Sequence, residues 1–149
     1  MDKPQELKEL LKQFQILELP TSTRTAADAA SSLNCQLGQI AKSIVFKTIT
    51  SKPILIIASG INRINEQIIS ELLKEDVVKA DAVFVKDRTG FTIGGVAPVG
   101  HLETIRTFID EDLFQYQEIW AAAGNPHAVF KLTPQQLAKI TKGLVIRVK

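Results

Sequence analysis

Short runs of β-branched and apolar residues, joined by links of hairpin length, constrain the fold of this chain more than any other feature. Residues 43–49 and 54–58 flank Thr50-Ser51-Lys52-Pro53 and predict a β-hairpin. Further strands are predicted at residues 91–96, 107–109, 118–122, 129–132 and 144–148. Strict alternation of strands and helices is absent, which argues against a doubly wound parallel sheet. The pattern favours an α+β domain with a mixed, curved sheet.

Helices are predicted near both ends of the chain and after the hairpin. The first starts at Asp2 and Pro4, and its apolar residues at helical spacing are Leu7, Leu10, Leu11, Phe14 and Leu17. A capping box from Thr25 to Asp28 opens the second helix, whose alanines predict close packing. Asn65 caps a third helix. Thr133 and Pro134 begin the last one, which ends at Gly143.

Length and composition set further limits. With 149 residues, 45% of them apolar and 23% charged, the chain fits one globular domain over residues 1–149, with residues 1–24 as an N-terminal helix and lead-in. No apolar stretch reaches the ~18 residues of a membrane span, so no membrane partner is expected. The N-terminus lacks the apolar core of a signal peptide, and one cysteine cannot form an internal disulfide. Both observations favour the cytoplasm.

Four of the eight glycines lie within eleven residues, in the segment from Thr89 to His101. Glycine weakens a strand unless the backbone must bend or something must approach it closely, so the pair Gly94-Gly95 needs a reason. One reading is a bulge or barrel corner. The other is a loop whose bare N–H groups face a ligand carbonyl or phosphate. Neither a P-loop nor a dinucleotide fingerprint fits the glycine spacing.

Lys42 lies among apolar residues at the start of a predicted strand. Period-two alternation places it on one face with Ile44 and Phe46, and places Ser43 and Val45 on the other. A lysine at the mouth of a core can bind an anion. By itself the pattern favours a snorkelling stem with a solvated ammonium group.

Other chemistry-bearing residues give weaker signals. Two histidines and one cysteine argue against a structural zinc site, and no metal site or cofactor is predicted. Cys35 fits a small buried hydrophobe, although a Cys–His hydrolase stays open because sequence cannot show spatial adjacency. The acidic run Asp110-Glu111-Asp112 predicts an exposed turn. No Gly-x-Ser-x-Gly elbow is present, which argues against an α/β-hydrolase.

Three elements together resemble the YbaK/EbsC family, the free-standing relatives of the editing domain inserted in bacterial prolyl-tRNA synthetase. They are Ile40-Ala-Lys42-Ser-Ile-Val-Phe46, the segment from Thr89 to Gly100 with its Gly-Gly-x-x-Pro loop, and Ile119-Trp-Ala-Ala-Ala-Gly124-Asn. The resemblance spans the chain from about Thr25 onward, in the family's order and spacing.

This resemblance implies an α+β fold with a mixed, curved, partly barrel-like sheet and flanking helices. It implies a cofactor-free hydrolase that removes a small wrong amino acid in trans (alanine, cysteine, serine or 2-aminobutyrate), most often from proline tRNA. The acceptor end of tRNA is the implied partner, with prolyl-tRNA synthetase as a second partner and no role for DNA. Lys42 and Gly94 match the family's functional lysine and the start of its loop. The implied substrate-binding residues are Ser43, Gly95, Val96, Ala97, Pro98, Gly124 and His127.

The physics agrees with such a site. An aminoacyl ester is activated, so a positioned water, N–H donors for the developing oxyanion and a cation near the terminal nucleotide suffice. The resemblance implies that Lys42 binds the terminal phosphate and that the loop backbone donates to the ester carbonyl. Two alternatives remain at this point: a non-catalytic tRNA- or protein-binding module of the same fold, and the hydrolase that depends on Cys35.

Overall fold

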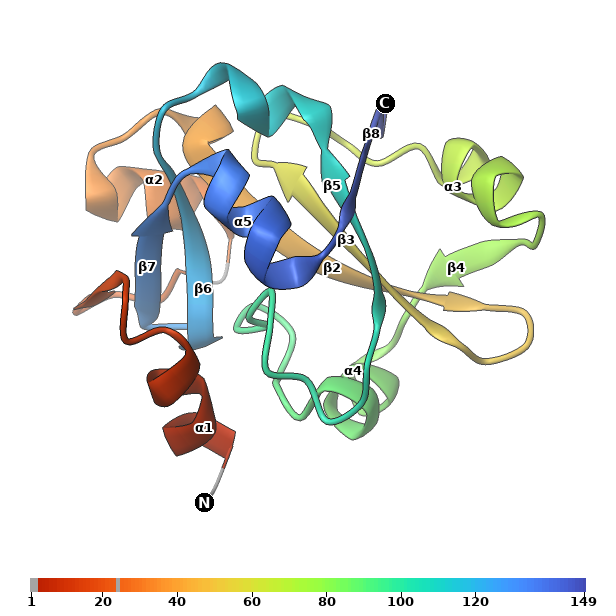
Figure 1. The fold of residues 1–149 in the computed structure, drawn as a ribbon, viewed down its shortest axis with the longest axis horizontal. Helices are drawn as coiled ribbons and strands as arrows, with labels where there is room; N and C mark the ends of the chain where they lie inside the picture. The colour runs from red at the N-terminus through yellow and green to blue at the C-terminus, as the bar shows by residue number, and fades with distance from the viewer. Residues whose placement is uncertain (1–2, 24) are drawn as a thin grey trace.

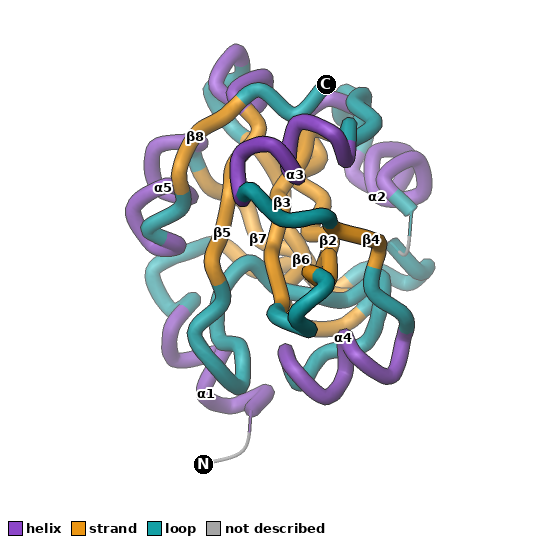
Figure 2. Tube along the Cα trace, turned by 90° about the vertical axis from the view of Figure 1, so that its right-hand side faces the viewer, coloured by secondary structure: helices purple, strands orange, loops and turns teal. Residues whose placement is uncertain are grey.

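A mixed, curled β-sheet with flanking helices forms the centre of the computed structural model, which describes residues 3–23 and 25–149 (Figures 1 and 2). Within those residues the sheet has eight strands in the order β1-β7-β6-β2-β3-β5-β8, and β4 pairs with β2. The strands are β1 (Gln15–Glu18), β2 (Ile40–Thr48), β3 (Pro53–Ser59), β4 (Val77–Lys79), β5 (Arg106–Asp110), β6 (Ile119–Asn125), β7 (Ala128–Leu132) and β8 (Leu144–Ile146). The predicted α+β class with a mixed, curved sheet is thereby confirmed.

Five α-helices surround the strands in the described part of the chain (Figure 2). They are α1 (Lys3–Leu10), α2 (Ala26–Leu33), α3 (Glu66–Leu73), α4 (Ala82–Thr89) and α5 (Pro134–Thr141), with two short 3₁₀ helices at Leu37–Gln39 and Glu111–Gln115. Thr25, Asn65 and Thr133 each act as the predicted N-cap, and the return bond that completes a capping box is recorded at Thr133. Thr25 Oγ1 accepts from Asp28 N at 3.1 Å, and Asn65 Oδ1 accepts from Gln67 N at 3.0 Å. Thr133 closes a full capping box with Gln136.

The predicted hairpin is the longest pairing of the sheet. β2 and β3 are antiparallel over seven residue pairs, from Ala41↔Ser59 to Lys47↔Pro53. Parallel pairs then join β3 to β5, β5 to β8 and β2 to β6. Both faces of β2 and β3 are covered, and their side chains divide between two apolar cores.

The larger core contains Val45, Leu55, Ile57 and Ile109, and it includes Leu7 of α1 and Leu11 just past the end of that helix. The smaller core lies on the other face of the same strands, and its buried residues are Phe46, Ile54, Ile56, Ile69, Val77, Phe108 and Val148. Alternation along β2 therefore sends Val45 to the larger core and Phe46 to the smaller one, as period two requires.

Three predictions about local structure are wrong. Residues 91–96 form a loop, because Gly94 adopts φ +88° and Gly95 N donates to Thr92 O at 2.9 Å in a turn. The first helix ends at Leu10, and Leu17 lies in β1, where strand pairing with β7 overrides the helical spacing. The proposed start at Asp2 lies outside the described residues.

The acidic run is the third correction. Asp110 is only 1% exposed, at the end of β5, and the 3₁₀ helix Glu111–Gln115 follows it. Its carboxylate accepts from Ser59 N at 3.0 Å, Asn62 Nδ2 at 2.8 Å and Asp112 N at 2.9 Å. Three donors replace the water that a buried carboxylate loses, so this position holds the sheet to its flanking turn.

Candidate functional site

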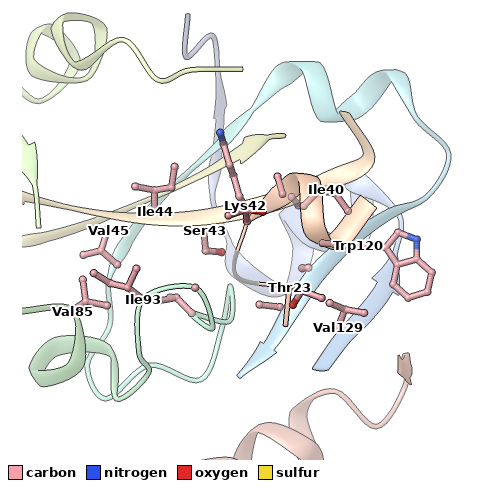
Figure 3. Close-up of a pocket in the computed structure, with 18 of the residues that line it drawn as sticks. Thr23, Ile40, Lys42, Ser43, Ile44, Val45, Val85, Ile93, Trp120 and Val129 are labelled. Atoms are coloured by element: carbon pink, nitrogen blue, oxygen red, sulfur yellow. The ribbon is translucent and has the colours of Figure 1, made fainter. Parts of the chain in front are cut away.

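A cavity of about 550 Å³ opens beside β2, between the glycine-rich loop, α2 and β6 (Figure 3). Residues 40–45 of β2 line one wall, and Ile93, Gly94 and Val96 of the loop line another. Small or aliphatic side chains contribute most of the remaining lining: Ala26, Ala29, Ala80, Val85, Ala121, Ala122 and Val129. A space of this size, largely apolar with a few polar groups, is typical of a small-molecule site.

The cavity lies where the sheet has a gap. On the side away from β3, β2 pairs with β6 only at Ile40 and Ala41, and with β4 only from Phe46 to Thr48. Between these two pairings, residues 42–45 have a strand neighbour on one side only. A stretch of strand edge is therefore open inside the sheet, and its backbone faces the cavity.

Hydrogen-bond alternation identifies the open groups. Gly60 N donates to Ile40 O at 2.8 Å and Thr48 N donates to Lys52 O at 3.0 Å, so even-numbered residues of β2 direct their N–H and C=O groups to β3. Odd-numbered residues face the other way, and Val45 O accepts from Ala80 N at 3.1 Å. Ser43 consequently directs its N–H and C=O into the gap, where it belongs to neither the pairing with β6 nor the pairing with β4.

The Ser43 side chain adds a third group. Its Oγ is buried and has no hydrogen-bond partner within the described part of the chain. In Figure 3 it points to the side of β2 that carries Val45, toward Val85 and Ile93. A buried hydroxyl without a partner carries a desolvation cost, which a ligand that bonds to it can recover.

Lys42 extends from the opposite face of β2, on the side of Ile44, as Figure 3 shows. Its half-buried ammonium group has a pKa below the ordinary lysine value, mainly because burial disfavours the charge and also because Lys79 repels it. The Asp110 carboxylate, on the same face of the sheet, opposes this shift. Lys42 and Lys79 both line the cavity, so they form a positive rim that suits an anion.

The glycine-rich loop contributes Gly94 and Val96 directly to the cavity wall. Gly95 packs behind it, where an added Cβ would lie 2.9 Å from Asn125 Cα. Ala97 and Pro98 are buried, and the Ala97 carbonyl contacts His101 Nε2 at 2.7 Å. The loop therefore has an inner row of residues that faces the cavity and an outer row that holds the inner one in place.

Gly124 and His127 lie outside the cavity wall. Gly124 has φ +103°, and an added Cβ would lie 2.5 Å from Leu7 Cδ2, so this position accommodates α1. His127 is exposed, and its Nδ1 contacts Leu19 O at 3.3 Å. Of the residues named from the sequence, the structure thus brings Lys42, Ser43, Gly94 and Val96 together around one space.

Sequence reasoning missed several residues of this site. Lys79 and Val85 belong to β4 and α4, two elements that the sequence analysis does not predict. Thr23 lines the cavity from the lead-in segment, and its Oγ1 donates to Pro126 O at 2.7 Å. Asp110 does not line the cavity but acts on the charge of Lys42, and it carried one usable signal, an acid directly after the apolar residues of a strand.

Cys35, the residue considered for a cysteine hydrolase, does not line the cavity. Cys35 is half-buried beside the small alanine-rich cluster under α2, and burial raises the pKa of its thiol. Across residues 3–23 and 25–149, no group of three or more His, Cys, Asp or Glu side chains could hold a metal ion. The helices in those ranges are all too short or too polar to cross a membrane.

Comparison with known proteins gives consistent results. Residues 21–140 match the sequence model of the aminoacyl-tRNA editing domain. The uncharacterised protein YwhH of Bacillus subtilis is 28% identical over 130 residues, covering 87% of this chain and 83% of YwhH. A protein of Enterococcus faecalis, provisionally named Cys-tRNA(Pro)/Cys-tRNA(Cys) deacylase EbsC, is 25% identical over 122 residues, covering 80% of this chain and 73% of EbsC.

A solved structure is similar along the whole chain. A protein provisionally described as a trans-editing enzyme for prolyl-tRNA synthetase superposes with a TM-score of 0.91 and 36% identity, covering 100% of this chain and 98% of that one. The matched residues include the strand with Lys42, the glycine-rich loop and the walls of the cavity. The chain therefore belongs to the aminoacyl-tRNA editing domain family.

Proposed function

We propose that this protein hydrolyses, in trans, the ester that joins a small wrong amino acid to tRNA, with proline tRNA as the preferred carrier. The observation that carries the proposal is the cavity itself, which combines a positive rim at Lys42 and Lys79 with an open backbone edge and methyl-sized walls. The names of EbsC and of the superposed structure support the same reaction class and the link to proline.

The reaction needs only modest catalysis. A water oxygen attacks the ester carbonyl carbon, the bond from that carbon to the ribose oxygen breaks, and a proton from the water passes to the leaving oxygen. The products are a free amino acid and tRNA with a free terminal hydroxyl. The largest barrier contribution is the negative charge on the carbonyl oxygen, which preorganised N–H donors stabilise.

The proposed roles follow from position. Lys42 holds the terminal phosphate of tRNA, since its ammonium lies at the rim and on the face of β2 away from Ser43. Gly94, in the loop, supplies an N–H donor to the carbonyl oxygen, and its own N–H has no partner in the described part of the chain. Ser43 and Val96 border the aminoacyl group, while Gly95, Ala97 and Pro98 hold the loop in shape. We place neither Gly124 nor His127 on the substrate.

Size selection also has a physical basis. Ala41, Ala121 and Ala122 present single methyl groups to the cavity, and Val45, Val85 and Val96 narrow it further. Walls of this kind suit a small side chain, and we propose that larger ones are excluded once the terminal nucleotide occupies the rest of the cavity. Alanine, cysteine, serine and 2-aminobutyrate belong to the fitting class. Prolyl-tRNA synthetase is proposed as a partner, because a segment of 91 residues is 33% identical to the proline–tRNA ligase of Brachyspira hyodysenteriae, of which it spans only 16%.

A deacylation panel tests the proposal. The purified protein is incubated with alanyl-, cysteinyl-, seryl- and 2-aminobutyryl-tRNA for proline, and release of amino acid is compared with release in buffer. We expect faster release from at least one of them. No release from any, with folded protein in excess, would refute the hydrolase and leave a tRNA- or protein-binding module. The cytoplasm, where tRNA is charged, is the proposed site of action.

A further inference from the structure

Ser43 offers three hydrogen-bonding groups to the cavity: a hydroxyl without a partner in the described residues, and the N–H and C=O of a position that pairs with neither β6 nor β4. Its N–H and C=O face the gap between β6 and β4, and its Oγ is buried on the cavity side of β2. Neighbouring odd-numbered residues use the same edge for pairing: Ala41 with β6, and Val45 with Ala80 N. The gap therefore has room for one residue opposite Ser43.

The chemistry of these groups specifies what fits. In an antiparallel hydrogen-bonded pair, two facing residues exchange both bonds, each N–H donating to the other's C=O. An aminoacyl ester carries the same atoms in the same order, an α-ammonium N–H and a carbonyl oxygen separated by one Cα. It is the smallest group that can complete a strand edge one residue wide.

We infer that the aminoacyl group of the substrate binds as a one-residue β-bridge opposite Ser43. Its α-ammonium donates to Ser43 O and Oγ, and its ester carbonyl accepts from Ser43 N. This inference rests on the proposed function and extends it, because it names Ser43 as the residue that recognises the α-amino group. Ser43 N–H and Gly94 N–H then form a pair of donors at the carbonyl oxygen, which is the usual composition of an oxyanion hole.

The bridge also fixes where the substrate side chain goes. Residues that face each other across a ladder direct their side chains to the same face of the sheet. The substrate side chain therefore lies on the Ser43 face, with Val45, Val85 and Val96, and away from Lys42 on the opposite face. Size selection and phosphate binding are thereby separated by the strand itself.

Three esters that differ only at the α-position test the bridge. Alanyl-tRNA carries an ammonium donor, lactyl-tRNA carries a neutral hydroxyl donor, and propionyl-tRNA carries none. Each enzymatic rate is divided by the rate of hydrolysis in buffer, which removes the difference in intrinsic ester reactivity. We expect the corrected kcat/KM of propionyl-tRNA to lie at least tenfold below that of alanyl-tRNA, with lactyl-tRNA nearer to alanyl-tRNA, because an unpaired carbonyl is costly. Equal corrected values for alanyl- and propionyl-tRNA would overturn the bridge while leaving the hydrolase intact.

A variant assigns the effect to Ser43. Ser43→Ala removes Oγ but leaves the backbone groups, so the ratio of alanyl to propionyl rates should shrink several-fold, through loss of alanyl turnover alone. Ser31→Ala, an exposed serine on α2 outside the cavity lining, is the matched control and should keep the wild-type ratio. An unchanged ratio in a folded Ser43→Ala variant would refute the role of Oγ.

Binding keeps this inference separate from the proposed hydrolysis. Alanyl- and propionyl-tRNA with an amide in place of the ester are hydrolysed far more slowly than the esters, so their Kd values report recognition without turnover. Weaker binding of the propionyl form supports the bridge even if the wild type hydrolyses no ester. Equal Kd values for the two would overturn it.

Discussion

Replacing Gly95 by alanine should damage activity through the packing of the glycine-rich loop. Gly95 does not have positive φ, so alanine adds no backbone strain there. Its Cβ would lie 2.9 Å from Asn125 Cα, 3.0 Å from Asn125 C and 3.2 Å from Pro126 Cδ. Two of these atoms belong to the backbone of Asn125, the last residue of β6, and backbone cannot rotate away as a side chain can. The loop must therefore move by several tenths of an ångström.

The magnitude follows from that displacement. Overpacking of this kind costs about 1–3 kcal/mol of unfolding free energy. The moved residues include Gly94 and Val96, which line the cavity. A misplacement approaching 1 Å in a reacting geometry costs on the order of a hundredfold in rate. We expect Gly95→Ala to lose about ten- to a hundredfold in kcat/KM per folded molecule.

Gly143→Ala is the matched control. An added Cβ there would meet Ile109 Cδ1 at 2.9 Å, also without positive φ, but between α5 and β8 and outside the cavity lining. Urea unfolding gives the stability of both variants, and deacylation of alanyl-tRNA gives their activity. Both should lose stability, and only Gly95→Ala should lose activity. Normal activity per folded Gly95→Ala molecule would refute a role of the loop in the site.

Three further predictions concern the side chains around the cavity. Lys42→Ala should lose activity by orders of magnitude, while its unfolding free energy changes by about 1 kcal/mol or less, because the half-buried ammonium makes no ion pair with the described residues. The control Lys52→Ala, at an exposed lysine, should alter neither activity nor stability. If Lys42→Ala unfolds easily, the role of Lys42 is structural. Burial and Lys79 lower the pKa of Lys42, so the affinity for tRNA without an attached amino acid should fall with rising pH before ordinary lysines titrate. The Lys42→Arg variant should keep its affinity over the same pH range. Identical pH profiles for the two proteins would contradict this role. Cys35→Ser should keep the deacylation rate within a few-fold of wild type, since burial raises the thiol pKa and keeps it protonated; near-total loss would revive the cysteine hydrolase.

The sign of the lysine shift also bears on stability. Folding places the Lys42 ammonium in a site that disfavours its charge, so the folded state binds its proton less tightly than the unfolded state. The resulting destabilisation is present below the lowered pKa and is relieved as the pH rises through it toward the ordinary lysine value. Removing the charge should therefore not destabilise the fold, in line with the expectation for Lys42→Ala.

The sequence predicted those helices and strands whose apolar spacing and cap residues match the packing that the structure shows. The hairpin of β2 and β3 has β-branched residues on both faces, and the helices capped by Thr25, Asn65 and Thr133 carry their start signals in the sequence. α4 escaped prediction, because Ala82-Val-Phe-Val resembles a strand and only the Asp81 cap marks a helix. The glycine-rich segment was mistaken for a strand because its apolar residues alternate with small ones.

The site was less accessible from sequence than the fold. Lys42 and Gly94 stood out as residue types in unusual places, and the resemblance added Ser43 and Val96. The opening beside Ser43 depends on which strands pair with β2 and where each pairing stops, and no local pattern encodes that. The burial of Asp110 likewise depends on donors from Ser59 and Asn62, about fifty residues earlier in the chain.

The pairing of β1 with β7 has a consequence for synthesis on the ribosome. Gln15 faces Lys131 and Glu18 faces Ala128, so the last pairing at one end of the sheet joins segments more than a hundred residues apart. Closing so long a loop is entropically costly, and sheets built from distant partners fold slowly. In the nascent chain, residues 15–18 therefore have no strand partner until β7 has left the exit tunnel. Gln15 and Glu18, at the two ends of this segment, are polar and exposed in the finished fold, which limits early association of the unpaired strand.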